Sequence, residues 1–164
     1  MEEISKILKK ALELEVNGYE FYNKCSELTD SKEAKEMFSF LAKEEQRHYE
    51  KIEEIYMENF KGDYFTYERN LLSETRNANF EKIFSLGNLK EKADIIDALN
   101  LGIKAEKDSI ELYNNLSESF EDKNLKELFE KLAGEEKKHL IILEEEKEFI
   151  TDTGAFKDFR VVTM

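Results

Sequence analysis

Two short stretches of the sequence decide the fold: residues 41–48, LAKEEQRH, and residues 132–139, LAGEEKKH. Each ends in Glu-x-x-His, which places a carboxylate and an imidazole about one turn apart on one face of a helix. The stretches lie 91 positions apart, and the same offset aligns further residues without a gap. The aligned pairs are Tyr22 with Tyr113, Phe38 with Phe129, Leu41 with Leu132, Ala42 with Ala133 and His48 with His139. This regularity predicts an internal duplication of a helical hairpin.

Both motifs lie within long stretches that have the character of helices. The chain contains no proline, the strongest helix breaker, and it is rich in Glu, Lys, Leu and Ala. Apolar residues recur at three- and four-residue spacing, which is typical of amphipathic helices. The predicted helices cover residues 2–29, 31–60, 93–119 and 122–150. Ser31 and Asp122 are the predicted N-caps of the second and the fourth helix.

The connections between these helices differ in length. Very short connections within each hairpin force antiparallel neighbours, whereas residues 61–93 are too many for a turn and suit a crossover that returns along the bundle. We expect a short helix within the crossover, at residues 78–84. The C-terminal tail, residues 152–164, loses the helical period but keeps apolar residues, which suit an ordered cap or a dimer contact. The prediction is an all-α protein with one four-helix bundle over residues 1–151.

Composition restricts the classes of function. The chain has 164 residues, 40% of them hydrophobic and 38% charged, with a formal net charge of −13. This composition indicates one soluble globular domain whose acidic surface repels phosphate backbones and anionic lipid but suits small cations. No apolar run is long enough to span a membrane, and the first ten residues do not resemble a signal peptide. We therefore expect no nucleic-acid partner, no membrane partner and a cytoplasmic location.

The single cysteine, Cys25, restricts the chemistry further. It can form no intramolecular disulfide and cannot supply a four-cysteine metal site. Because Cys25 lies on an apolar stripe, we expect a buried, inert thiol. Any metal in this chain must therefore bind oxygen and nitrogen ligands.

Six ionisable residues interrupt the apolar stripes near the midpoints of the helices. They are Glu15, Glu45, His48, Glu106, Glu136 and His139, and they obey the 91-residue offset. Burying four ionised carboxylates together is very costly unless positive charge lies among them. Two divalent cations would cancel this charge and leave both imidazoles neutral as nitrogen ligands. The pattern predicts a dinuclear carboxylate site, in which Glu15 and Glu106 bridge the two ions.

Further repeated residues lie beside these six. Glu20, Glu44, Glu111 and Glu135 are rotated by about 100° to 140° from the stripes and are assigned to the surface. Tyr22 and Tyr113 share the faces of Glu15 and Glu106, so each phenol either hydrogen-bonds a ligand carboxylate of a neighbouring helix or packs in the core. A buried Glu and His network without metal is the structural alternative, although it would lack compensating positive charge.

The segments ALELEVNGYEFY, LAKEEQRH, GIKAEKDSIELY and LAGEEKKH resemble the four ligand-bearing helices of the rubrerythrin family, within the ferritin-like superfamily. The resemblance covers about residues 2–150. It implies a ferritin-like four-helix bundle with a long crossover between helices 2 and 3, and a non-haem di-iron centre that reacts with hydrogen peroxide or oxygen. The resemblance implies that the six ionisable residues occupy the ligand positions of two iron ions. The same ligands accept manganese or zinc. The family also implies a homodimer, in some members with exchanged helices.

This chain departs from rubrerythrins at two points. It lacks the cysteines of a rubredoxin domain, so the resemblance implies an external electron donor such as a rubredoxin-type protein. Ser109 replaces a further Glu that rubrerythrins carry three residues after the third-helix ligand, which weakens the case for peroxidase chemistry more than the case for metal binding. The expected function is reduction of hydrogen peroxide in oxidative-stress defence. A ferritin-like iron-binding or ferroxidase protein and a structural bundle with a vestigial metal site are the alternatives.

Overall fold

The computed structural model describes residues 2–60, residue 89 and residues 91–154, and these form a bundle of long helices. The helices are α1 Glu2–Leu28, α2 Lys32–Asn59, α5 Lys92–Ser119 and α6 Lys123–Thr153. The predicted helices agree with these bounds, except that α6 continues three residues beyond the expected residue 150. The expected short helix at 78–84, nearly all of the crossover 61–93 and most of the tail 152–164 lie outside the described residues.

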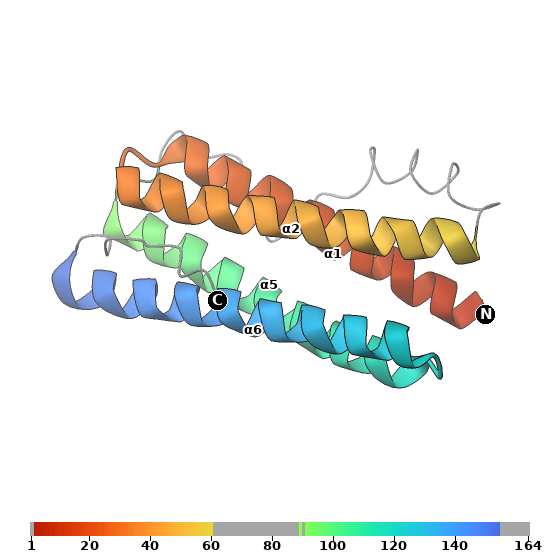
Figure 1. Cartoon of the computed structure of the whole chain (residues 1–164). Helices are drawn as coiled ribbons and strands as arrows, with labels where there is room; N and C mark the ends of the chain where they lie inside the picture. The colour runs from red at the N-terminus through yellow and green to blue at the C-terminus, as the bar shows by residue number, and fades with distance from the viewer. Residues whose placement is uncertain (1, 61–88, 90, 155–164) are drawn as a thin grey trace.

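The arrangement of the helices agrees with the duplicated hairpin (Figure 1). Helices α1 and α2 are antiparallel neighbours, as are α5 and α6. Helices α2 and α5 run in the same direction, so the end of α2 and the start of α5 lie at opposite ends of the bundle. Parallel second and third helices are typical of ferritin-like bundles, in which one long crossover connects them.

In each hairpin, a side chain that caps the helix N-terminus marks where the second helix, α2 or α6, begins. The side chain of Ser31 accepts a hydrogen bond from the backbone N–H of Ala34 at 3.2 Å. The side chain of Asp122 accepts from the N–H of Asn124 at 2.8 Å and from that of Leu125 at 3.2 Å. Both predicted N-caps are confirmed. At its other end α6 stops at Gly154, whose φ of 76° is a left-handed conformation that glycine adopts without strain.

The apolar core consists of two clusters that lie one beyond the other along the bundle. One includes Phe21 and Phe38, and the other includes Leu12 and Phe129. On each helix the ionisable stripe residues fall in sequence between the positions that enter the two clusters. The polar centre is therefore covered by apolar packing on both sides.

Two further expectations concern the single cysteine and the possibility of a membrane-spanning helix. Cys25 is fully buried, and burial raises the pKa of its thiol, which keeps it protonated and inert as expected. Within the described residues, no helix combines the length and the apolar character that a membrane span requires.

Candidate metal centre

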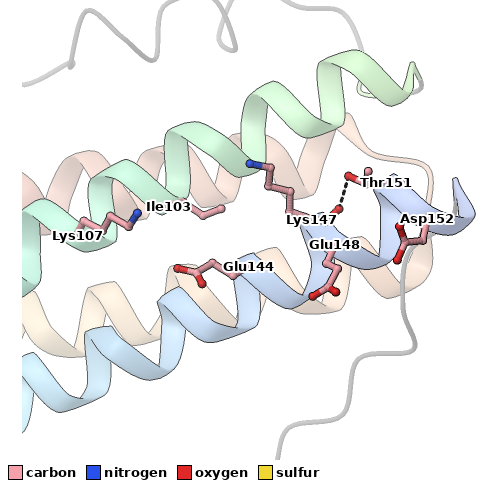
Figure 2. A pocket seen from close by; sticks show the side chains of 7 residues that line it. All are labelled: Ile103, Lys107, Glu144, Lys147, Glu148, Thr151 and Asp152. Carbon is pink, nitrogen blue, oxygen red and sulfur yellow. Dashed lines mark hydrogen bonds between the residues drawn. The ribbon is translucent and has the colours of Figure 1, made fainter.

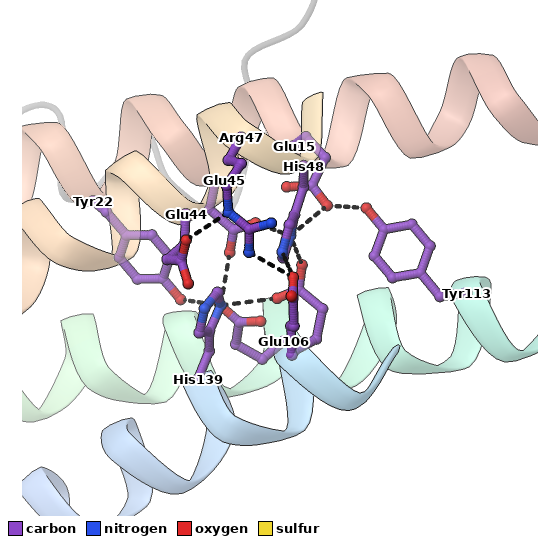
Figure 3. Close-up of polar contacts among 11 residues, drawn as sticks. Glu15, Tyr22, Glu44, Glu45, Arg47, His48, Glu106, Tyr113 and His139 are labelled. Atoms are coloured by element: carbon purple, nitrogen blue, oxygen red, sulfur yellow. Dashed lines mark hydrogen bonds and ion pairs between the residues drawn. The ribbon is translucent and has the colours of Figure 1, made fainter. Parts of the chain in front are cut away.

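The structure brings the six predicted residues together at the middle of the bundle, where all four helices contribute (Figure 3). Each of the six side chains belongs to a residue that is at most 4% exposed. Their role as metal ligands stays a prediction, but their burial and proximity are as the sequence indicated.

The six residues form two overlapping groups, and this overlap corrects one expectation. The first group consists of Glu15, Glu45, His48 and Glu136. The second group consists of Glu45, Glu106, Glu136 and His139. Within each group the ligand atoms lie within 4.8 Å of one another, a spacing suited to one ion per group. Glu45 and Glu136 belong to both groups, whereas Glu15 and Glu106 each belong to one. The carboxylates that two ions would share are therefore those of the Glu-x-x-His motifs rather than Glu15 and Glu106.

Both histidines turn the same ring nitrogen toward the centre. Nδ1 of His48 lies 2.8 Å from Oε1 of Glu136, and Nδ1 of His139 lies 3.1 Å from Oε2 of the same residue. The two imidazole rings stack, with centroids 5.7 Å apart. The shared carboxylate therefore stands between two nitrogens that could each bind an ion.

Two carboxylate oxygens in the centre have no hydrogen-bond partner. Oε2 of Glu15 and Oε2 of Glu106 are buried and unsatisfied, one in each group. Leaving a buried acceptor unpaired costs about 1–3 kcal/mol, more for a charged group. A cation in each group would provide these oxygens with a partner, so the donor set fits two divalent metal ions.

Protons can balance the charge of the cluster when no metal is bound. The pKa values of Glu15 and Glu106 are raised, first by burial and then by the neighbouring carboxylates. The pKa of His48 is raised because hydrogen bonds to Glu135 and Glu136 outweigh burial, and that of His139 because Glu106 outweighs burial. In a network without metal, the two imidazoles are the groups that can supply compensating positive charge. The unpaired oxygens, rather than charge balance, favour metal.

The two repeated tyrosines hold the outer carboxylates reciprocally. The hydroxyl of Tyr22 on α1 donates to Oε1 of Glu106 on α5 at 2.6 Å, and that of Tyr113 on α5 donates to Oε1 of Glu15 on α1. The backbone of Gly102 lies beside the Tyr22 hydroxyl, and a Cβ there would crowd Leu143, at 3.1 Å from its Cδ1. Of the two interpretations of these tyrosines, hydrogen bonding to a candidate ligand is confirmed.

The surface assignment of two other carboxylates is wrong. Glu135 has a side chain only 16% exposed, and its Oε2 lies 2.6 Å from Nε2 of His48. Glu44 is half-buried, and its pKa is lowered to about 2 by the neighbouring His139 and by Arg47. A helical wheel does not predict the contact of Glu135 with His48, because it joins residues of two different helices, α6 and α2. Glu111 is exposed as expected, and Glu20 is half-buried.

Sequence reasoning also missed Arg47, which lies beside both of these carboxylates. Its Nε donates to Glu44 at 2.9 Å and a terminal nitrogen donates to Glu135 at 2.7 Å. The only sequence signal was its place immediately before His48 in the first motif.

A separate surface pocket lies between α5 and α6 (Figure 2). Ile103, Lys107 and Lys147 line it together with acidic residues of α6. None of the six predicted residues lines this pocket, and it has neither the burial nor the ligand spacing of the centre. The central cluster is therefore the candidate site.

Comparisons with known proteins agree with this geometry. The Rubrerythrin family model matches residues 6–147. No curated protein sequence matches the chain significantly. Among solved structures, a hypothetical protein from Pyrococcus furiosus is similar, with a TM-score of 0.74 and 24% sequence identity over 91% of this chain and 90% of that chain. That likeness shows a shared fold.

The family match spans most of the chain and includes all six residues of the candidate centre. The all-α, ferritin-like architecture and the buried Glu and His cluster both fit a di-iron protein of this type. The chain belongs to the rubrerythrin family.

Proposed function

We propose that this protein is a non-haem di-iron oxidoreductase that reduces hydrogen peroxide in oxidative-stress defence. The observation that carries the proposal is the pair of buried ligand groups that share Glu45 and Glu136. Such sharing brings two ions close enough to act on one small molecule. The proposed location is the cytoplasm, and the proposed assembly is a homodimer.

The proposed cofactor is two iron ions per chain, held by the six residues of the centre. When bound, two ferrous ions would supply the two electrons that, with two protons, convert one hydrogen peroxide molecule into two water molecules. Manganese or zinc would also fit the ligands. The single buried cysteine cannot form a four-cysteine iron site, so the proposal assigns the electrons for further turnovers to an external donor such as a rubredoxin-type protein.

The residues around the centre have defined parts in this proposal. Nδ1 of each imidazole and the unpaired oxygens of Glu15 and Glu106 would hold the ions. Tyr22 and Tyr113 keep the two outer carboxylates in place through their other oxygens. The two apolar clusters exclude bulk water from the centre, which strengthens the electrostatic interactions inside it.

A ferritin-like role in binding or oxidising iron is the second candidate. The observation that favours it is Ser109, a nearly buried hydroxyl at the position where rubrerythrins carry a further carboxylate. With one carboxylate fewer, the centre would be less suited to peroxide chemistry than those of rubrerythrins.

The decisive experiment is anaerobic loading with Fe(II), followed by rapid mixing with hydrogen peroxide or with oxygen while ferric absorbance is recorded. A peroxide reductase is expected to oxidise much faster with peroxide, to turn over with an artificial reductant and to retain about two irons per chain. Glu13→Gln is a suitable control because this exposed residue lies outside the centre on the same helix as Glu15.

The other results would each support a different function. Equal rates with oxygen and peroxide, without turnover, would favour the iron-binding or ferroxidase role. Continued uptake of ferric iron would indicate storage. A failure to retain metal after loading would leave a structural bundle with a vestigial site.

A further inference from the structure

Arg47 lies over the seam between α2 and α6, on the solvent side of the buried centre (Figure 3). Its side chain is 36% exposed, and its guanidinium forms ion pairs with Glu44 at 2.9 Å and Glu135 at 2.7 Å. The guanidinium is planar and has several donors in a fixed arrangement, so it can hold two carboxylates at once. One residue of α2 thus joins a carboxylate of its own helix to one of the opposite helix.

Glu135 connects Arg47 to the first histidine. Oε2 of Glu135 accepts from Arg47 and lies 2.6 Å from Nε2 of His48. An ionised carboxylate only accepts hydrogen bonds, so Nε2 must carry a proton here. The contact therefore orients the ring with Nδ1 toward the centre, as outer partners of metal-binding histidines generally do.

Glu44 makes the corresponding connection to the second histidine. It lies beside His139, whose imidazole is the main cause that lowers the pKa of Glu44 to about 2, and the 91-residue offset relates this pair to Glu135 and His48 (Figure 3). Hydrogen bonds therefore run from His48 through Glu135 and Arg47 to Glu44, which lies beside His139.

The arginine has no counterpart in the second half of the duplication. The position equivalent to Arg47 in the second hairpin is Lys138, and this side chain is exposed. The two halves of the centre are alike in their six inner residues but differ in this outer residue. Arg47 is therefore the residue through which the two halves can be coupled.

We propose that Arg47 is a positioning residue that couples the two halves of the metal centre by holding Glu135 on the outer nitrogen of His48 and Glu44 beside His139. The proposal rests on the metal-binding part of the proposed function and does not require peroxide reduction. Loss of Arg47 would free both outer carboxylates together, so both imidazoles would lose their fixed orientation.

The first test is NMR of the metal-free protein labelled with 15N-histidine. The chain has only two histidines, so both imidazoles can be followed without overlap. Arg47→Gln is expected to shift or broaden the Nε2 and Nε2–H signals of His48 and His139 together. Lys138→Gln, which removes the same charge from the equivalent position, is expected to leave both unchanged. Glu135→Gln should affect mainly His48, and Glu44→Gln mainly His139.

The second test is calorimetric titration with zinc, which binds without redox chemistry. Arg47→Gln is expected to weaken both zinc sites by about 10- to 100-fold, the usual effect of losing an outer partner of a ligand. Lys138→Gln should bind zinc as the unmodified protein does. Arg47→Lys should restore only part of the affinity, because one ammonium does not replace the planar guanidinium.

Three results would overturn the proposal. The first is an Arg47→Gln variant that matches Lys138→Gln in spectra and zinc affinity. The second is a change confined to His48, which would show that Arg47 does not reach the other half. The third is full restoration by Arg47→Lys, which would indicate that charge alone matters. Circular dichroism of each variant checks that the exposed substitution leaves the helices folded.

Discussion

Glu45 and Glu136 differ from the other candidate ligands because both groups of the centre contain them. Each comes from a Glu-x-x-His motif, so each also lies one turn from a histidine of its own helix. The outer carboxylates, Glu15 and Glu106, belong to one group each and are held by a tyrosine. At the scale of single residues, the shared and the outer carboxylates should therefore respond differently to substitution.

Substitution of one shared and one outer carboxylate tests this difference. Glu45→Gln should lower the affinity for both ions, because an amide is a poor bridging ligand, whereas Glu15→Gln should weaken one. After anaerobic loading and desalting, the metal content measured by atomic spectroscopy should fall from about two per chain to near zero in the first variant and to about one in the second. Glu13→Gln is the matched control. An equal loss in both variants would contradict the assignment.

The tyrosine contacts predict an effect on stability. Tyr22→Phe leaves Oε1 of Glu106 buried without its donor, so the free energy of unfolding of the metal-free protein should fall by about 1–3 kcal/mol. Urea denaturation followed by circular dichroism measures this change. Tyr19→Phe removes a hydroxyl from a partly buried tyrosine on the same helix and is the control. If the two variants are equally stable, the hydrogen bond contributes nothing measurable.

At the scale of elements, each hairpin is defined by where its second helix begins. Asp122 satisfies two backbone N–H groups at the start of α6, and its negative charge also suits a helix N-terminus. The cap thus fixes the first turn of the helix that later presents Glu136 and His139.

Removal of this cap should destabilise the bundle without changing the centre. Asp122→Ala is expected to lower the free energy of unfolding by about 0.5–2 kcal/mol. Glu121→Ala removes the same charge from the preceding exposed residue and should have a much smaller effect. Chemical denaturation of both variants makes the comparison, and zinc affinity should be unchanged in each. Equal destabilisation would mean that charge, not capping, is responsible.

At the scale of the whole molecule, the folded metal-free protein binds protons that the unfolded chain releases. The pKa values of Glu15, Glu106, His48 and His139 are all raised by the folded environment. Stability from such groups is complete below their unfolded pKa values, about 4.5 for Glu and 6.5 for His, and is lost as pH rises toward the folded values. Glu44 and Glu135, with pKa values of about 2, add stability that stays constant above about pH 5.

The thermal stability of metal-free protein should therefore fall as pH rises from about 5 to 9. Zinc-loaded protein should fall much less, because the ions replace the protons of the centre. Thermal melting of both forms across this range measures the difference, which should widen with pH. Parallel curves would contradict a buried centre that exchanges protons for metal.

Much of this molecule follows from local features of the sequence. The apolar period predicts the helices, the Ser31 and Asp122 side chains predict two helix starts, and the offset of 91 residues predicts the hairpin repeat. Interrupted apolar stripes also identify the six central residues. These predictions succeed because helical period, capping and burial depend on residues close together in the chain.

Contacts between helices depend on more than these local patterns. A helical wheel places Glu44 and Glu135 off the apolar stripe, yet Glu135 contacts His48 of another helix, and Arg47 joins the two carboxylates. A helical wheel also does not predict that Glu45 and Glu136, rather than Glu15 and Glu106, belong to both candidate ligand groups. The sequence determined which residues face inward, whereas tertiary structure decided which of them meet, because the rotation and spacing of packed helices arise from side-chain packing along their whole length.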